Sequence, residues 1–318
     1  MLRLFHSIFG GEKAPERYPE TLVRAAIERA VDGTDPWLRG LSGYRRKLRP
    51  AVLHAIDHVV GLVDSMEDAL ELSRKSFDDA PQLKLFFISC EQLDRLLDSD
   101  PVLTAFHGEA GRAAQPAWAL LTMECELRQS FGFEQQGEMI VRDVPQVTVS
   151  MSAHRLLDPA TDLAETRRLL KRRAFDHLLT LALARIAAVQ DVREDLVQHR
   201  TMLQSKLGYL QRGDWGFGGL GREVPAPVAE LQQQINEIES QLSAVGGDDR
   251  YLEKNMEILV DVLANAQQQL WAQPLALIVD RMGIRRNQAS ADAPELVLTE
   301  LHNKAGRRLV ARLVMLPA

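Results

Sequence analysis

The stretch VAELQQQINEIESQLSAV, residues 228–245, decides the fold of this chain of 318 residues. Its aliphatic residues are spaced three and four apart, which places them on one helix face as the a and d positions of a heptad repeat. They are Val228, Leu231, Ile235, Ile238, Leu242 and Val245. A helix with so narrow an apolar seam needs a second helix to cover it, so the pattern predicts a coiled coil.

The predicted partner is a long helix earlier in the chain. Residues 161–211 contain no proline, and their first glycine is Gly208. Aliphatic residues recur there at alternating three- and four-residue steps, although Arg193 and Arg200 occupy two of the steps. Arginine stems can cover apolar surface, so the stripe is imperfect but usable. A helix of this length spans about 75 Å.

The chain returns along this helix in two pieces. The heptad pattern breaks at Gly246 and resumes at Leu252, one heptad after Val245, so the phase is preserved and the path stays nearly straight. The two pieces together cover nearly the length of the outgoing helix. We therefore expect an antiparallel coiled-coil hairpin over residues 161–272, with a glycine-rich tip at residues 213–221.

Strand patterns lie on both sides of this predicted arm. Residues 136–160 alternate apolar and polar side chains and predict a β-hairpin of two strands flanking Pro145. Residues 273–318 hold further strand patterns, with a turn over Asn303–Gly306. Because proline cannot donate a ladder hydrogen bond, we expect Pro145 at the connection or at a sheet edge. The two regions predict one small antiparallel sheet, with the arm inserted between its strands.

Residues 1–135 predict a helical domain. Apolar residues recur with helical spacing over residues 19–32, 48–63 and 113–130, and prolines and glycines break the pattern between helices. The predicted fold is thus α+β and mainly α. It combines a helical N-terminal domain, a small antiparallel sheet and a long coiled-coil hairpin.

The tip carries three large apolar residues, Trp215, Phe217 and Leu220, among glycines. Its glycines match G-x-G-x-x-G, but a dinucleotide-binding loop follows a strand, whereas a long helix precedes this one. Two interpretations stay open. The apolar residues form a contact surface for a partner, or Trp215 and Phe217 fold back and cap the open end of the coiled coil.

Basic residues gather near the predicted base of the arm, where they are candidates for binding nucleic acid or an acidic protein surface. They are Arg168, Arg172 and Arg173 in the long helix, and Arg285, Arg286, Arg307 and Arg308 in the C-terminal region. The net charge is −6, and acidic residues are dense in residues 64–100, so we expect internal neutralisation of these cations. Aromatic residues do not alternate with the cations, as they do in single-strand binding surfaces.

The sequence assigns no catalytic residue and no cofactor. His54 and His58 have an i, i+4 spacing that can hold a metal, but no third ligand is identifiable, so we predict no metal site. The two cysteines, Cys90 and Cys125, form no C-x-x-C pair, which favours a reducing, cytoplasmic compartment. The apolar patch Met1–Phe9 has one cation, so we expect it to pack on the protein rather than on a membrane.

These observations favour a non-enzymatic interaction protein, an adaptor or assembly component that uses the projecting arm. Its partner would be another protein or a second copy of the chain. A nucleic-acid-associated protein that uses the arginine-rich patch is the first alternative. An enzyme with a site between the helical domain and the sheet is the second.

Overall fold

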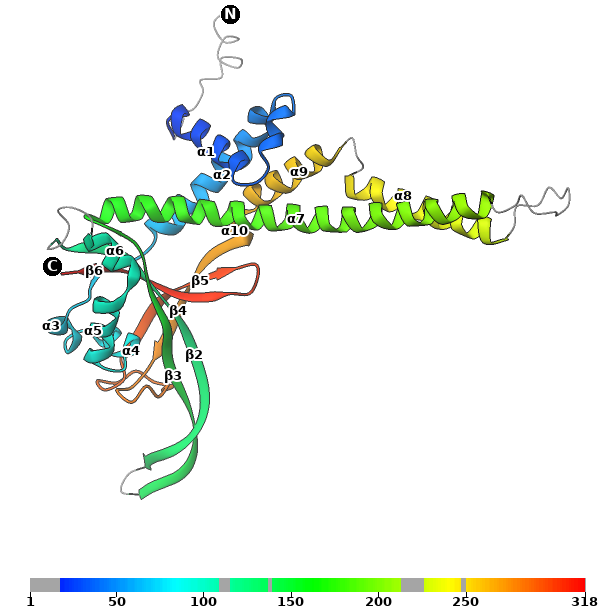
Figure 1. Ribbon diagram of the computed structural model, residues 1–318. Coiled ribbons are helices and arrows are strands. Elements are labelled where there is room, and N and C mark those ends of the chain that lie inside the picture. Colours follow the sequence, from blue (N-terminus) through cyan, green and yellow to red (C-terminus); the bar gives the residue numbers. More distant parts are fainter. Residues whose placement is uncertain (1–17, 109–114, 137–138, 213–225, 247–249, 318) are drawn as a thin grey trace, which may run out of the picture. The chain divides into compact units, whose positions relative to one another are not determined.

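The computed structural model describes residues 18–108, 115–136, 139–212, 226–246 and 250–317. The fold is α+β, as predicted (Figure 1). The chain divides into two compact units: residues 1–55 with 176–265 form unit 1, and residues 56–175 with 266–318 form unit 2. The predicted helical domain 1–135 is therefore not one unit, because its residues 56–135 belong with the sheet.

Unit 1 is helical. Its elements are α1 (Glu20–Asp32), the short 3-10 helix η1 (Pro36–Gly40), the first half of α2 (Tyr44–Asp64), most of α7 (Leu163–Arg212), α8 (Ala226–Gly246) and α9 (Tyr251–Ala264). The α1 helix buries one aliphatic face, as its spacing predicts.

Helices α7, α8 and α9 form the predicted antiparallel hairpin. Arg185 of α7 pairs with Asp261 of α9 at 2.8 Å, and two turns later the Arg193 guanidinium lies 6.0 Å from the Tyr251 ring centroid. The residue numbers of the contacting side chains rise along α7 and fall along α9, so the two helices run in opposite directions.

The heptad seam of α8 is buried against the last turns of α7. The buried cluster consists of Leu203, Leu231, Ile235, Ile238 and Leu242, and the partly buried residues Leu196, Val197 and Leu207 pack against it. The seam is therefore closed within one chain, and these parts of α7 and α8 form a two-helix arm within unit 1 (Figure 1).

Unit 2 contains a sheet with the strand order β3-β2-β6-β5-β4. The strands are β2 (Ala117–Gln136), β3 (Met139–Ala160), β4 (Leu270–Ile278), β5 (Glu295–Asn303) and β6 (Arg308–Leu316). Neighbours along this order are antiparallel, while the two-residue strand β1 (Leu70–Glu71) pairs with β6 in parallel. The turn predicted at Asn303–Gly306 joins β5 to β6, and Gly306 has the left-handed φ of +82° that favours glycine.

The helix predicted over residues 113–130 is wrong, because these residues lead into and form β2. Apart from the buried Thr122, residues 117–123 are apolar, and they lie between β3 and β6, where a central strand buries both sides. A short apolar run of this kind fits a buried strand and a buried helix equally well.

The hairpin predicted within residues 136–160 is also wrong in its detail. These residues form one long strand, β3, and the chain reverses between β2 and β3 instead. Pro145 lies inside β3 opposite Phe131, on the outermost strand of the sheet order. The expectation that Pro145 occupies an edge is confirmed.

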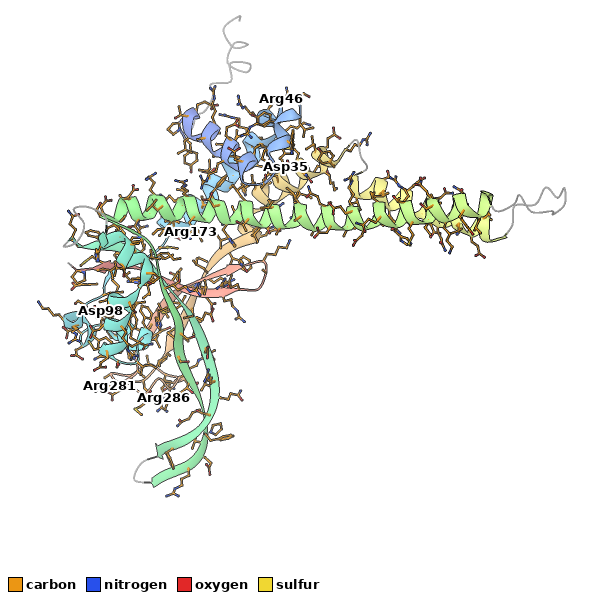
Figure 2. The ribbon with its side chains drawn as sticks, viewed as in Figure 1. Asp35, Arg46, Asp98, Arg173, Arg281 and Arg286 are labelled. Carbon is orange, nitrogen blue, oxygen red and sulfur yellow. The ribbon has the colours of Figure 1, made fainter. Side chains whose placement is uncertain are left out.

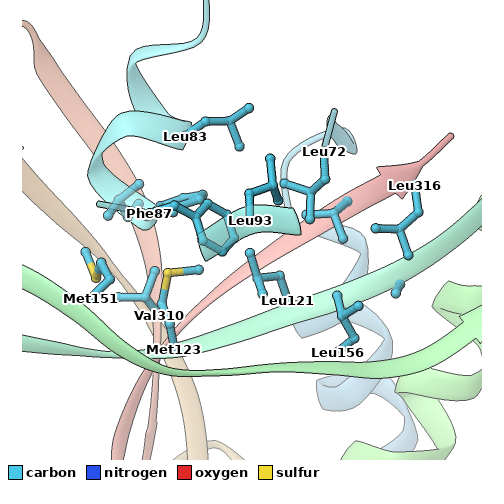
Figure 3. Packing of buried hydrophobic residues seen from close by; sticks show 14 of the residues in the cluster. Leu72, Leu83, Phe87, Leu93, Leu121, Met123, Met151, Leu156, Val310 and Leu316 are labelled. Carbon is cyan, nitrogen blue, oxygen red and sulfur yellow. The ribbon is translucent and has the colours of Figure 1, made fainter. Parts of the chain in front are cut away.

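Four short helices cover one face of this sheet: α3 (Arg74–Phe77), α4 (Pro81–Phe86), α5 (Cys90–Ser99) and α6 (Pro101–Gly108) (Figure 1). Leu83, Phe87 and Leu93 from this layer pack on Leu121 and Met123 of β2, as Figure 3 shows. The other face is covered by a smaller cluster around Leu170 of α7 and Val63 of α2, and the short helix α10 (Ala266–Gln269) precedes β4.

Strand β3 is bent by three bulges, each of which adds one residue relative to β2. The bulges contain Asp143, Ala153 and Asp158, which have positive φ angles of 60°, 52° and 51°. Bulges of this kind increase local twist and redirect a strand.

The segment that follows β4 reaches the outer edge of β3. The Val149 amide donates to the Gly283 carbonyl at 2.8 Å, and the Arg285 amide donates to the Val147 carbonyl at 2.8 Å. The Arg286 amide donates back to the Ile278 carbonyl. Residues 279–286 therefore join the two outermost strands of the sheet at this end.

Candidate docking surface

Trp215, Phe217 and Leu220, the predicted contact residues of the tip, lie outside the described residues, as does the Met1–Phe9 patch. The choice between a contact surface and a folded-back cap therefore stays a prediction.

Part of the predicted arginine patch is neutralised by nearby acids. Arg168 pairs with Glu165 one turn away, and Arg173 forms two hydrogen bonds with Asp158 at 2.6 and 2.7 Å. Arg286 pairs with Asp280 at 2.7 Å. Figure 2 labels Arg173 and Arg286, which lie on well-separated elements of unit 2.

The acidic segment 64–100 also contributes to this neutralisation. Asp64 pairs with Lys171 at 2.7 Å, and Glu67 pairs with Arg312 of β6. Burial lowers the pKa of the Arg312 guanidinium. The acidic segment therefore supplies partners for Lys171 and Arg312, whereas the acids that pair with Arg168, Arg173 and Arg286 lie outside it.

The remaining arginines do not gather into one patch. Arg172, Arg285, Arg307 and Arg308 are exposed, but they lie on α7, on the segment after β4 and at the β5–β6 turn. The start of α7 is fixed near Met315, because Thr166 donates to the carbonyl of Trp118, the register partner of Met315. Arg308 lies seven residues from Met315 along an extended strand, which is about 23 Å.

The histidine pair is not assembled into a metal site. Nε2 of His58 lies 2.6 Å from the Leu270 carbonyl oxygen and donates a hydrogen bond to it. Within the described parts of the chain, no group of three or more His, Cys, Asp or Glu side chains is arranged to hold a metal ion.

Cys125 lacks the features of an activated thiol. It lies in β2, and burial, together with the nearby Glu300 carboxylate, raises its thiol pKa above the ordinary value. Nucleophilic cysteines have a lowered pKa in an electropositive setting. The environment of Cys125 therefore favours a structural thiol.

The structure reveals a groove in unit 2 that sequence analysis did not predict. It has a volume of about 540 Å³ and lies between α4, β3 and residues 279–296. Its lining is mostly apolar and includes Leu85, Phe86, Val149, Met151, Val279 and Leu296. Cavities of this size with apolar walls are typical of binding sites.

Two large apolar side chains at this groove are exposed to solvent: Ile88 is 86% exposed and Met282 is 79% exposed. Both line the groove: Ile88 follows α4, and Met282 lies in the segment after β4. Two isolated apolar residues flanking an apolar groove mark a contact surface more strongly than either does alone.

The charged residues around the groove are paired with each other. Arg281 lies 3.4 Å from Asp292, Lys84 lies 3.9 Å from the Asp78 carboxylate, and Asp280 pairs with Arg286. Figure 2 labels Arg281 and Arg286, which lie in the segment after β4. The rim thus carries both signs of charge and selects neither a strongly acidic nor a strongly basic ligand.

Asp280 fixes the wall that carries Met282. Burial raises the pKa of its carboxyl, but hydrogen bonds from the Ile284 amide, the Arg286 side chain and the Met282 amide outweigh burial and lower the pKa overall. The two amide contacts measure 2.9 and 3.0 Å. The turn is therefore held in place before any ligand arrives.

His154 of β3 supports the opposite wall. Its Nε2 atom donates to the Phe86 carbonyl at 2.6 Å, and its ring stacks on Phe87 at 4.8 Å between centroids. Burial lowers the pKa of this imidazole, while the hydrogen bond to the Phe86 carbonyl raises it by less. His154 thereby anchors the end of α4 just before Ile88.

The groove continues onto an exposed apolar ribbon. β2 pairs with β6 only over residues 117–123, and beyond them β2 pairs with β3 alone. The side chains of Leu127, Phe131 and Phe133 on this two-stranded part are exposed, and Leu127 is the register partner of Val149 in the groove. The outermost strands, β3 and β4, each contain a proline, Pro145 and Pro274 respectively. These prolines hinder pairing of a strand edge with another strand.

Sequence reasoning missed this groove because its walls come from three distant parts of the chain. The available sequence signal is modest: Ile88 ends the apolar run of residues 85–88, and Met282 lies between Arg281 and Gly283.

No protein-family model matches the chain, and neither the curated proteins nor the solved structures provide a match. Among the helices the structure describes, none combines the length and the apolar character required to cross a bilayer.

Proposed function

We propose that this protein is a non-enzymatic interaction protein, an adaptor or assembly component, that presents contact surfaces on its α7–α8 arm. A single observation carries the proposal: the heptad seam of α8 is filled by residues of α7 from the same chain. The arm therefore needs no second chain to form, and its outer surface remains available.

The outer surface of the arm carries apolar residues that its own seam does not use. Met202 is 61% exposed and Tyr209 is 75% exposed, and they lie one heptad apart on α7. Residues at this spacing share one helix face, which is the geometry of a helix presented to a partner. Tyrosine and methionine are also enriched in protein–protein interfaces.

The nucleic-acid alternative receives less support. Its candidate cations are partly paired with acids, and the exposed ones are spread over separate elements. Phosphate binding strengthens when cations cluster along one surface, which these residues do not do.

The proposal is tested with the full chain and a variant that combines Met202→Ser with Tyr209→Ser. Partners captured by the tagged wild-type protein are identified, purified and titrated against both proteins. We expect the variant to bind its partner at least about tenfold more weakly, the loss of a modest contact. Trp37→Ser, which removes a 75% exposed side chain from η1, is the matched control and retains binding.

Equal affinity of the arm variant and the wild type for every purified partner would contradict the proposal. So would a protein that neither captures a partner nor self-associates, or one whose sole interaction is a salt-dependent binding to nucleic acid.

A further inference from the structure

We infer that the groove of unit 2 binds residues 213–225 of a second copy of this chain, so that copies associate head to tail. The inference rests on the proposed function, and it names one partner of the arm.

The first step is that the groove needs an apolar ligand. Its walls are largely apolar, its charged rim residues are paired with each other, and Ile88 and Met282 stand exposed beside it. A ligand that fills it must supply apolar side chains and little net charge.

The second step is that residues 213–225 have this chemistry. Their sequence is GDWGFGGLGREVP, which combines three large apolar side chains with five glycines. Asp214 and Glu223 offset Arg222 to within one charge, so the segment suits a rim of balanced charge. Glycine places no side chain between the backbone and a groove wall.

The third step compares this segment with the other parts of the chain that lie outside the described residues. Residues 109–114, 137–138 and 247–249 are short and have no large apolar side chain. Residues 1–17 contain the apolar patch Met1–Phe9, and they are the alternative occupant that the experiment must distinguish.

Helices α7 and α8 determine where residues 213–225 are attached to the arm. The thirteen residues of this segment connect Arg212, the end of α7, with Ala226, the start of α8. These helices pack together through Leu207 and Leu231, so the segment must leave and return at the same end of the arm. The arm therefore offers it to a neighbouring molecule.

Head-to-tail binding of this kind uses two different surfaces and does not close on a pair of copies. Each chain would keep one free groove and one free segment, so association continues with concentration unless a ring forms. This behaviour separates the inference from a symmetric dimer.

The experiment uses two full-length variants that lose opposite halves of the contact. The tip variant combines Trp215→Ser with Phe217→Ser. The groove variant combines Ile88→Glu with Met282→Glu, both at exposed positions where folding tolerates charge. Val297→Glu on β5, 47% exposed, is the matched control for the groove variant. Circular dichroism confirms that each variant is folded.

Mass is measured by light scattering during size-exclusion chromatography. The inference predicts concentration-dependent oligomers for the wild type and the Val297→Glu control, and monomers for each variant alone. An equimolar mixture of the two variants is predicted to give a dimer that does not grow, because one intact groove and one intact segment remain.

Wild-type protein that stays monomeric up to high concentration would overturn the inference, as would a mixture of the two variants that does not associate. Variants that each still dimerise would indicate arm-to-arm pairing. Oligomers lost only on deletion of residues 1–17 would identify that segment as the occupant. The proposed function is judged separately, by the effect of Met202→Ser and Tyr209→Ser on binding of another protein.

Discussion

Asn255 of α9 donates a hydrogen bond from Nδ2 to Oδ2 of Asp35, at 2.8 Å, and both side chains are buried in unit 1. The other oxygen of Asp35 accepts from the Trp37 amide at 2.9 Å and caps η1. A buried carboxylate must be satisfied by donors, so this pair fixes where α9 meets the N-terminal helices.

Replacing Asn255 by Ala is predicted to destabilise unit 1 by about 1–3 kcal/mol, because one oxygen of the buried Asp35 carboxylate loses its donor. Urea denaturation followed by circular dichroism measures the change. Asn236→Ala, at an exposed position of α8, is the control and is expected to change stability by less than about 0.5 kcal/mol. Equal effects of the two substitutions would contradict this role for Asn255.

Replacing Ala153 by Gly is predicted to stabilise unit 2 by about 0.5–1 kcal/mol. Ala153 is exposed and has a φ of 52°, which costs an L-residue about 1–2 kcal/mol and glycine almost nothing, while the added chain freedom of glycine offsets part of the gain. Ala276→Gly, an exposed position in ordinary strand geometry in β4, is expected to destabilise instead. Thermal unfolding measures the stability of both variants. A destabilised Ala153→Gly protein would contradict the positive φ angle of Ala153 in the bulge.

Arg167 supports the end of α2 with a geometry that lysine cannot copy. Its two terminal nitrogens donate to the carbonyls of Val63 and Met66 at 2.8 and 3.2 Å, and its side chain is 18% exposed. We predict that Arg167→Lys lowers the free energy of unfolding by about 1–2 kcal/mol although the charge is kept. Arg168→Lys, at the exposed pair with Glu165, serves as the comparison and is expected to change little. If both variants unfold at the same urea concentration, the two hydrogen bonds from the Arg167 guanidinium do not contribute to stability.

His154 makes the stability of unit 2 depend on pH. Its folded-state pKa is lowered below the ordinary 6.5 by burial, so the unfolded chain binds this proton more readily than the folded one. The stabilisation of the folded state by neutral His154 is complete above about pH 6.5. It declines as the pH falls from there towards the folded-state pKa. His154→Gln, which can still donate to the Phe86 carbonyl, is predicted to flatten this decline in unfolding curves at pH 5–8. His199→Gln, on an exposed position of α7, leaves the slope as in the wild type, and a slope unchanged in both variants would contradict the assignment.

Periodic elements of this fold were predictable from sequence, and non-periodic ones were not. α7 has one dominant pattern, and its predicted range, residues 161–211, falls within two residues of the observed one. β2 was mistaken for a helix because residues such as Ala119, Leu121 and Met123 are good helix formers. Their position between two strands overrides that propensity.

The candidate site was less predictable than the fold. Neutralisation of Arg168 and Arg173 is expected from the dense acids of residues 64–100, but their observed partners, Glu165 and Asp158, lie outside that segment. The groove depends on Ile88 and Met282 facing one cavity from positions almost two hundred residues apart. Only the bulged path of β3 and the return of residues 279–286 to its edge bring its walls together.

The claim on which the proposed function depends most is that α7 pairs with the returning helices of its own chain. It is tested by crosslinking Arg185→Cys to Asp261→Cys in a chain that also carries Cys90→Ala and Cys125→Ala, with a short bismaleimide at low protein concentration. The 2.8 Å ion pair between the two native side chains predicts rapid crosslinking within one chain, with the monomer mass retained. Crosslinked dimers in place of that monomer, or no crosslink at all, would contradict the account.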